Sequence, residues 1–272
     1  MRVATIALSF ALISPNPLPA DPHLHRTPPQ QAAATSSPTA PTLQQSLATL
    51  VGNASLTDVT LTGSVRRIAG SDDESGTSAL EALTTGESRM DLSLPSGPHT
   101  EVVAIGNNCL SGNWSGPDGV AHPISNHNLL TDTAWFFPVF TVGRIISSGK
   151  YIVSYVGHET RNGQAVEHFI AYQPSTVQLP AGIPTFSHLT QMDLFLDSIT
   201  LMPAALAFNI HPDNNMGLDI PVEIRFSDYR SVSGVQIPFH IEKFVNNSLM
   251  LDFQAQTVAI NTGLTSSTFS AQ

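Results

Sequence analysis

The sequence predicts a mainly β protein built on one strongly curved antiparallel sheet. The first observation is a period of two between residues 191 and 261, where five segments alternate apolar and polar residues between turn signals. This period places the apolar side chains of each segment on one face of a strand. The five apolar faces are Met192, Leu194 and Leu196; Ala204, Leu206, Phe208 and Ile210; Ile220, Val222, Ile224 and Phe226; Ile237, Phe239 and Ile241; and Leu249, Leu251 and Phe253.

The second observation is that two of these segments change phase without a turn. Apolar residues pass from odd to even positions near Lys243, and they do so again near Gln256. A β-bulge inserts one residue into a strand in this way, and bulges bend a sheet. We therefore predict a bulge at each place and strong curvature of the sheet.

Composition narrows the class of protein. Charged residues make up 12% of the chain, about half of the usual share of about 25%, and this mix is typical of secreted or cell-envelope β proteins. The net charge is −10 and the 11 Lys and Arg residues are not clustered, which argues against nucleic acid as a partner. Cys109 is the only cysteine, so neither an intramolecular disulfide nor a thiolate metal site can form, and we expect its side chain to be buried.

The N-terminal residues predict export. Arg2 is followed by an apolar run over 3–13 and then by Leu18, Pro19 and Ala20, a pattern typical of a signal peptide over 1–20. The run is too short to span a bilayer. Residues 21–40 are rich in Pro, Ala, Ser and Thr and predict a disordered linker. We expect residues 41–272 to form one domain, without a transmembrane segment, in a periplasmic or secreted protein.

Local signals place the remaining elements of the first half. Apolar residues at helical spacing follow Pro41 and stop at Gly52, which predicts a short helix between them. A strand is expected from residue 59 to 65, and a turn over 70–76 follows it. A Gly-rich hairpin around Trp114 ends this half of the chain. The other strands expected in this half cover residues 77–83, 87–95 and 100–106.

The clearest turn lies in the middle of the chain. Asn162-Gly163 separates two apolar-rich runs over 151–159 and 165–172, as a two-residue type I′ hairpin requires. This turn would place His158 opposite Glu167 and Glu159 on the same face as His168. We interpret these as cross-strand ion pairs.

An aromatic segment over 129–146 stands apart from the strands. It contains Trp135, Phe136, Phe137 and Phe140 within six positions, together with Pro138. Because proline ends one helix and can begin another, we expect two apolar helices separated by Pro138. So many aromatic side chains must bury a large surface.

The sequence shows no catalytic motif. Ser115 lies between glycines at the wrong spacing for a nucleophile elbow, and His158-Glu159 lacks the second histidine of a zinc-protease helix. Residues 213–219 resemble the start of a calcium loop, but the glycine is displaced and no glutamate stands at the twelfth position, so we interpret them as a turn. No catalytic residue, metal ligand or cofactor is therefore assigned. The scattered histidines are interpreted as surface or core residues, namely His122, His127 and His188, with His23 and His25 solvated in the linker.

Residues roughly from 190 to 270 resemble a known family. The pattern consists of Asp197–Pro203 at a strand end, Tyr229 on a later strand, Gly234–Pro238 opening the next, then Val258–Asn261, with Phe269 beyond. This pattern resembles the outer-membrane lipoprotein-sorting proteins of the LolA and LolB type. The similar residues are structural and carry no chemistry.

The resemblance implies a curved antiparallel half-barrel of about eleven strands, whose concave apolar face is closed by short helices. It implies a monomeric, non-enzymatic protein that holds a hydrophobic small molecule or a lipoprotein acyl chain under the segment over 129–146. The residues expected to contact that ligand are Trp135, Phe136, Phe140 and Ile145.

Two alternatives stay open from the sequence. One is a structural or interaction protein of the envelope, whose aromatic segment only fills a core. The other is an envelope hydrolase that pairs a carboxylate with His158 or His168. A cavity larger than about 300 Å³ under Trp135 would favour ligand binding, and a tightly packed interior would favour a structural role.

Overall fold

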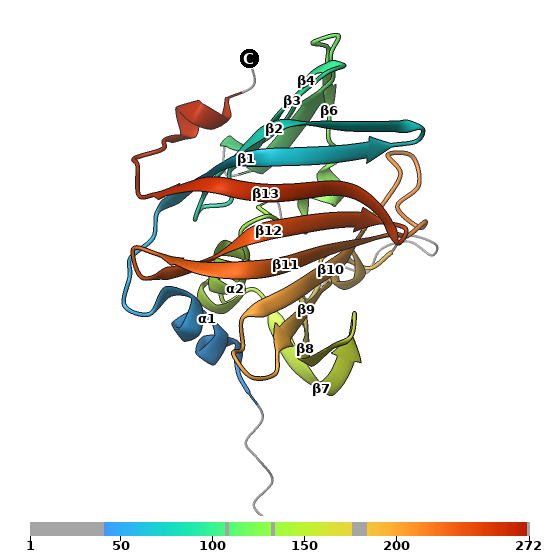
Figure 1. Ribbon diagram of the computed structural model, residues 1–272. Coiled ribbons are helices and arrows are strands. Elements are labelled where there is room, and N and C mark those ends of the chain that lie inside the picture. The colour runs from blue at the N-terminus through green and yellow to red at the C-terminus, as the bar shows by residue number, and fades with distance from the viewer. Residues whose placement is uncertain (1–40, 107–108, 132–133, 176–183, 271–272) are drawn as a thin grey trace, which may run out of the picture. The chain divides into compact units, whose positions relative to one another are not determined.

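The computed structural model describes residues 41–106, 109–131, 134–175 and 184–270. Thirteen strands form one antiparallel sheet in the order β6-β5-β4-β3-β2-β1-β13-β12-β11-β10-β9-β8-β7 (Figure 1). They are β1 (Asp58–Ala69), β2 (Asp72–Leu83), β3 (Ser88–Leu94), β4 (Gly97–Gly106), β5 (Cys109–Ser115), β6 (Ala121–Pro123), β7 (Ile152–Arg161), β8 (Gln164–Tyr172), β9 (Met192–Asp197), β10 (Pro203–Ile210), β11 (Ile220–Val232), β12 (Val235–Val245) and β13 (Ser248–Ile260).

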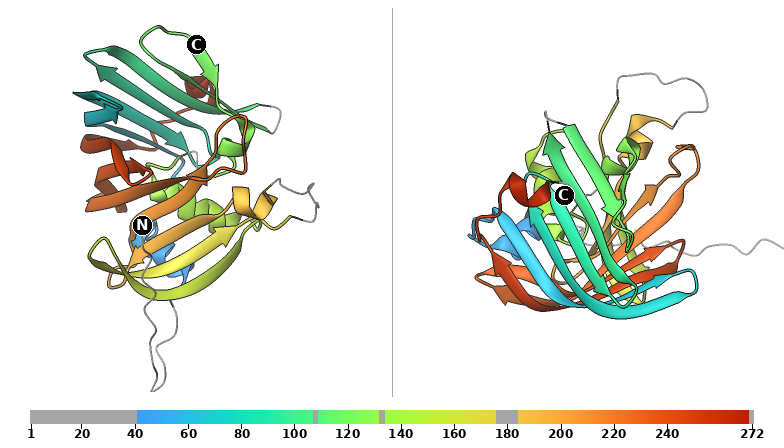
Figure 2. Two further views of the ribbon diagram at one scale, coloured as in Figure 1. Left: turned by 90° about the vertical axis from the view of Figure 1, so that its right-hand side faces the viewer. Right: turned by 90° about the horizontal axis from the view of Figure 1, so that it is seen from above.

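The sheet does not close on itself. Its two edge strands are β6 and β7, and the first and last strands, β1 and β13, pair in the middle. Figure 2 shows the strong bend of the sheet, which gives it a concave and a convex face. The predicted class, a mainly β antiparallel half-barrel, is therefore confirmed, with two strands more than the resemblance implies.

Both predicted bulges are present. The pairing of β12 with β13 shifts register between Lys243 and Phe244. The pairing of β1 with β13 passes from Thr257 to Ala255 and so omits Gln256. Gly63, which pairs with Ala255, has no room for a side chain, because a Cβ there would lie 2.0 Å from the carbonyl oxygen of Gln254.

Within the described residues, five short helical segments accompany the sheet, and two of them, α1 (Leu43–Val51) and α2 (Pro138–Ser147), pack on its inner face. The others are α3 (Phe186–Leu189) and the 3-10 turns η1 (Asn126–Leu129) and η2 (Ser266–Phe269). Helix α1 begins as predicted, and its N-cap Thr42 forms a capping box with Gln45. Side chains of α1 and α2 join the inner faces of the strands in one hydrophobic core. None of the helices in the described residues is long and apolar enough to cross a membrane.

Three local expectations were wrong. Pro138 does not separate two helices, because residues 134–136 form turns and Pro138 is the first residue of α2. The turn expected over 70–76 is confined to residues 70–71, and β2 starts at Asp72. The side chain of Cys109 is exposed and unpaired with any other cysteine.

The β7–β8 hairpin has the predicted turn and pairing. Asn162 and Gly163 have φ angles of 52° and 79°, as type I′ geometry requires. His158 is opposite Glu167, with its Nδ1 3.0 Å from the Glu167 carboxylate, and His168 Nδ1 lies 3.7 Å from Glu159.

Replacing Gly163 by Val should lower the free energy of unfolding by about 1 kcal/mol or more, because a β-branched residue is strained at positive φ. Urea denaturation measures the change. The matched control is Thr160→Val, since this nearby position is exposed and lies in a strand. An unchanged unfolding midpoint for the Gly163 variant would show that the loop has another shape.

A buried carboxylate joins the start of β1 to the segment after β13. Asp58 is 1% exposed, and its oxygens accept hydrogen bonds from the backbone N–H and hydroxyl of Thr262, at 2.7 and 2.9 Å, from Gly263 N–H at 3.1 Å and from the Thr57 hydroxyl at 2.9 Å. Burial acts to raise the pKa of the Asp58 carboxyl, but these hydrogen bonds outweigh it and leave the pKa below its ordinary value.

The lowered pKa of Asp58 predicts a pH-dependent contribution to stability. The unfolded state binds the proton more tightly, so the contribution is complete above the ordinary pKa of 3.8 and is lost as pH falls through the lower pKa of the folded state. Asp58→Asn should cost about 2 kcal/mol at neutral pH, because the amide leaves buried donors unpaired, and should flatten the fall in stability below about pH 4. Urea denaturation from pH 3 to 7 tests this, with Asp72→Asn at the exposed start of β2 as control. Parallel pH profiles for the wild type and Asp58→Asn would contradict it.

Candidate functional site

An apolar pocket of about 330 Å³ lies between α1 and α2. Leu47 and Val51 of α1 line one side at i, i+4 spacing, and Val139, Phe140 and Gly143 of α2 line the other. The segment after α1 and the β2–β3 turn complete the wall. Gly143 helps to keep the pocket open, because a Cβ at this position would have its nearest neighbour 4.0 Å away, at Leu47.

The four residues expected to contact a ligand are all buried. Trp135, Phe136, Phe140 and Ile145 are 4%, 1%, 6% and 2% exposed and belong to the same hydrophobic core as the inner face of the sheet. Of the four, only Phe140 lines the α1–α2 pocket, so this pocket is not the cavity under Trp135 by which the sequence alternatives were to be separated. The structure thus brings the four together at the concave face, and their contact with a ligand stays a prediction.

Aromatic contacts order this segment. Trp135 packs edge-on against Phe136, with ring centres 5.6 Å apart, and Phe137 packs the same way against Phe140 at 4.7 Å. The Nζ atom of Lys243 lies 4.5 Å from the centre of the Trp135 ring, within the range of a cation–π contact. Lys243 lies where the pairing of β12 with β13 shifts register by one residue, Met250 of β13, so the sheet contacts Trp135 at this bulge.

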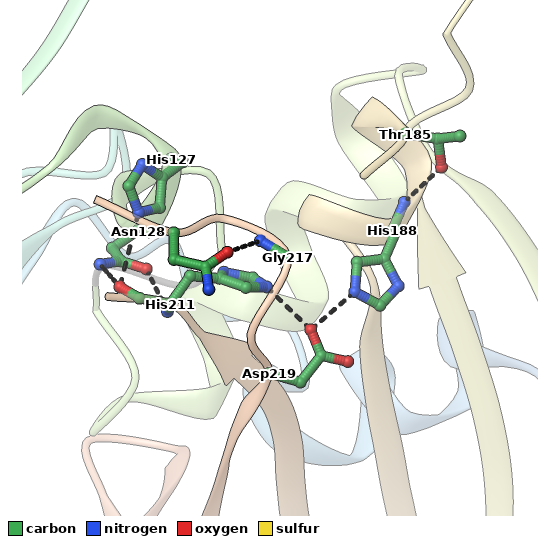
Figure 3. A network of polar contacts seen from close by, with 8 residues as sticks. His127, Asn128, Thr185, His188, His211, Gly217 and Asp219 are labelled. Atoms are coloured by element: carbon green, nitrogen blue, oxygen red, sulfur yellow. Dashed lines mark hydrogen bonds and ion pairs between the residues drawn. The ribbon is translucent and has the colours of Figure 1, made fainter. Parts of the chain in front are cut away.

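A second cluster lies at one end of the β10–β11 hairpin (Figure 3). The Nε2 atoms of His188 and His211 lie 2.9 and 3.1 Å from the same oxygen, Oδ1 of Asp219. His211 directly follows β10, Asp219 directly precedes β11, and His188 belongs to α3. One nitrogen of each imidazole and one oxygen of the carboxylate, the atoms that could bind a metal ion, all lie within 4.8 Å of one another.

Neighbouring residues hold the backbone of both histidines in place. Asn128 of η1 accepts a hydrogen bond from the His211 backbone N–H and donates one to the His211 carbonyl, both at 2.8 Å. The hydroxyl of Thr185 accepts a hydrogen bond from the backbone N–H of His188 at the start of α3. His127 lies next to the cluster, with its ring centre 5.9 Å from that of His211.

The electrostatics favour a neutral imidazole beside a carboxylate. Burial lowers the pKa of His211, and the neighbouring Asp219 only partly opposes this. Burial acts to raise the pKa of Asp219, but the two histidines outweigh it and hold this pKa below its ordinary value. Neutral imidazoles and ionised carboxylates are the forms that bind metal ions.

His158 of β7 and His168 of β8, the histidines of the hydrolase alternative, each lie within hydrogen-bonding distance of a carboxylate. His158 lies beside Glu167, which also accepts a hydrogen bond from the Tyr155 hydroxyl at 2.5 Å. His168 Nε2 lies 2.7 Å from Asp193. The contact of His158 with Glu167 is the predicted cross-strand pair, whereas the contact of His168 with Asp193 of β9 was not predicted.

A serine, a histidine and an aspartate also lie in a row on the convex face, each within hydrogen-bonding distance of the next. Ser227 Oγ is 3.0 Å from Nδ1 of His240, whose Nε2 is 3.0 Å from Asp252. In serine hydrolases the ring nitrogens have the reverse roles, with Nε2 toward the hydroxyl and Nδ1 toward the carboxylate. Ser227 and His240 are also direct partners in the β11–β12 pairing, so we interpret the three as cross-strand polar contacts.

Comparison with known proteins identifies the fold. No protein-family model and no curated protein sequence matches the chain. Among solved structures, an outer-membrane lipoprotein-sorting protein domain from Vibrio parahaemolyticus is 13% identical, with a TM-score of 0.50 over 84% of this chain and 97% of that one. A LolA superfamily protein from Nitrosomonas europaea is 10% identical, with a TM-score of 0.51 over 84% and 96%. The fold is LolA-like.

A DUF1329 family protein from Desulfovibrio piger matches this chain to a similar extent, with 8% identity and a TM-score of 0.50 over 84% of this chain and 95% of that one. The family resemblance seen in the C-terminal sequence is thus confirmed at the level of the fold. Because these identities are low, the roles of individual residues have to be argued from this chain.

The LolA-like fold brings together residues that the sequence did not connect. From the sequence, His188 and the loop over 213–219 were considered as possible metal ligands, but they were treated separately, and His211 was not considered. Asp213, at the start of that loop, accepts a hydrogen bond from Ser125 and lies outside the cluster. One signal in the sequence could have joined two residues of the cluster, because His211 and Asp219 are the first and last residues of the connection between two predicted strands.

Proposed function

We propose that this protein is an exported, non-enzymatic carrier, which holds a hydrophobic ligand between its helices and the concave face of its LolA-like sheet. The ligand class is a lipid, a lipoprotein acyl chain or another hydrophobic small molecule. The observation that supports this most is the apolar pocket of about 330 Å³ between α1 and α2, which falls within the range of about 300–1,000 Å³ for ligand pockets.

The pocket leads to the aromatic segment. Phe140 lines it and packs edge-on against Phe137, which is fully buried in the core. A short apolar chain bound in the pocket would therefore contact Phe140 first. A longer chain would have to move α2 away from the sheet, and it would then also contact Trp135, Phe136 and Ile145.

One charged residue accompanies the apolar lining. Arg144 follows Gly143 in α2 and forms part of the pocket wall, together with Thr84 and Thr85 of the β2–β3 turn. A guanidinium group and two hydroxyl groups suit an anionic or polar head group. We propose an amphiphile whose chain lies against α1 and α2 and whose head lies toward this side of the pocket.

The structural alternative rests on the same segment. Side chains as buried as Phe136 and Ile145 suit a core that is never opened, and truncating Trp135 to Ala would cost about 3–5 kcal/mol in that case. Such a loss alone cannot separate the alternatives, because a buried tryptophan stabilises a carrier as well. The test therefore has to fill the pocket and leave the core intact.

Gly143→Leu should abolish binding of a fluorescent fatty acid without lowering stability. The added side chain would occupy the α1–α2 pocket, and its Cβ would meet no atom closer than 4.0 Å. Leucine is also a better helix residue than glycine by about 0.5–1 kcal/mol. Fluorescence titration of delipidated protein should show micromolar binding by the wild type and at least about tenfold weaker binding by the variant, a loss of about 1.4 kcal/mol.

Ala48→Leu is the matched control, because it adds the same side chain to an exposed position of α1. It should leave probe binding unchanged. The proposal is contradicted if the delipidated wild type binds no probe, or if Gly143→Leu is more stable and binds as well as the wild type.

The proposed location follows from the N-terminal residues. Cleavage after Ala20 would release a chain that begins at Asp21 in the periplasm or outside the cell, where acyl chains need a carrier between membranes. We propose that it acts there as a monomer, with a membrane or a lipoprotein as the source of its ligand.

A further inference from the structure

The donor atoms of His188, His211 and Asp219 converge on one point from three segments. The two imidazole Nε2 atoms lie 2.9 and 3.1 Å from Asp219 Oδ1. Around a tetrahedral zinc ion, with bonds of about 2.0–2.2 Å, ligand atoms are about 3.3 Å apart. The two distances to Asp219 are close to this value, and the two Nε2 atoms lie within 4.8 Å of each other, so an ion would draw the two imidazoles closer together.

We propose that His188, His211 and Asp219 bind one divalent transition-metal ion of the zinc type. Two imidazole nitrogens and one carboxylate oxygen form a donor set that suits zinc and disfavours calcium and magnesium, which prefer oxygen ligands. Asp219 and His188 have side chains that are 42% and 40% exposed, so water can reach the fourth position of a tetrahedral ion.

Without an ion this arrangement is costly for a purely structural role. The His211 side chain is 1% exposed, and its Nδ1 atom has no hydrogen-bond partner among the described residues. Both histidines also approach the same oxygen of one carboxylate. Coordination through Nε2 would leave Nδ1 as the protonated nitrogen of the neutral ring, so what an ion supplies is a common partner for the two Nε2 atoms and the carboxylate oxygen that they now share.

The ligands are held in place before any ion binds. His211 and Asp219 flank Ile210 and Ile220, which pair at the end of β10 and β11. The paired hydrogen bonds from Asn128 fix the His211 backbone to η1. Coordination would thus connect α3 to the β10–β11 hairpin, and through Asn128 to the residues that precede the aromatic segment.

The cluster differs from the other histidine–carboxylate pairs of this chain. His240 and Asp252 are 3.0 Å apart, and His168 and Asp193 are 2.7 Å apart, but only the group of His188, His211 and Asp219 brings three such residues together within the described part of the chain. His240 is therefore a matched control, with one contact of the same length and no second imidazole.

The test is isothermal titration of the full chain, treated with a chelator and dialysed, with Zn²⁺. We expect one Zn²⁺ per chain with micromolar or tighter affinity, and no binding of Ca²⁺ or Mg²⁺ under the same conditions. Because loss of even an outer-shell partner costs a metal site about 10- to 100-fold in affinity, His188→Ala and Asp219→Asn should each weaken binding at least about 100-fold. His240→Ala should leave it unchanged.

Two further measurements keep the result decisive. Co²⁺ added to the wild type should give the intense visible absorption of a tetrahedral site, which does not depend on how any variant folds. A double variant, His23→Ala with His25→Ala, removes the histidine pair of the N-terminal linker and should bind Zn²⁺ as tightly as the wild type. Absence of saturable Zn²⁺ binding, equal affinity of His188→Ala and the wild type, or loss of binding with His23 and His25 would each overturn the proposal.

Discussion

A sheet that bends without closing leaves its concave face to be covered by other parts of the chain. Here the bend comes from the bulges at Lys243 and Gln256, and the cover consists of α1, α2 and the aromatic residues before Pro138. The cover is incomplete where Gly143 faces Leu47, and the pocket lies there. The need to cover this face thus explains the burial of the aromatic segment, the position of the helices and the place where a ligand could bind.

Much of this frame could be predicted because its signals are local. The period of two assigns one face of each C-terminal strand, the phase shifts place the bulges, and Asn162-Gly163 fixes its hairpin, since the geometry of each depends on a few neighbouring residues. The segment around Pro138 was predicted less well. Proline is equally compatible with ending a helix and with beginning one, and the choice depends on how the preceding aromatic residues pack.

The histidine cluster could not be predicted for a different reason. His211 and Asp219 are joined by the register of β10 and β11, which pairs Ile210 with Ile220, and no short turn motif in the intervening residues fixes that register. His188 reaches them from α3, and its position depends on the tertiary fold. The prediction for Trp135 has the same limit, because its apolar character shows that the side chain is covered and does not show what covers it.

The central claim is that the concave face of this LolA-like sheet carries a hydrophobic ligand. Native mass spectrometry of the protein, purified from the envelope of the cells that make it and not delipidated, tests this most directly. The claim predicts a species heavier than the polypeptide by the mass of one lipid or acyl compound, which is released on collisional activation. A spectrum that contains the bare polypeptide mass alone would contradict it and would favour a packed structural protein.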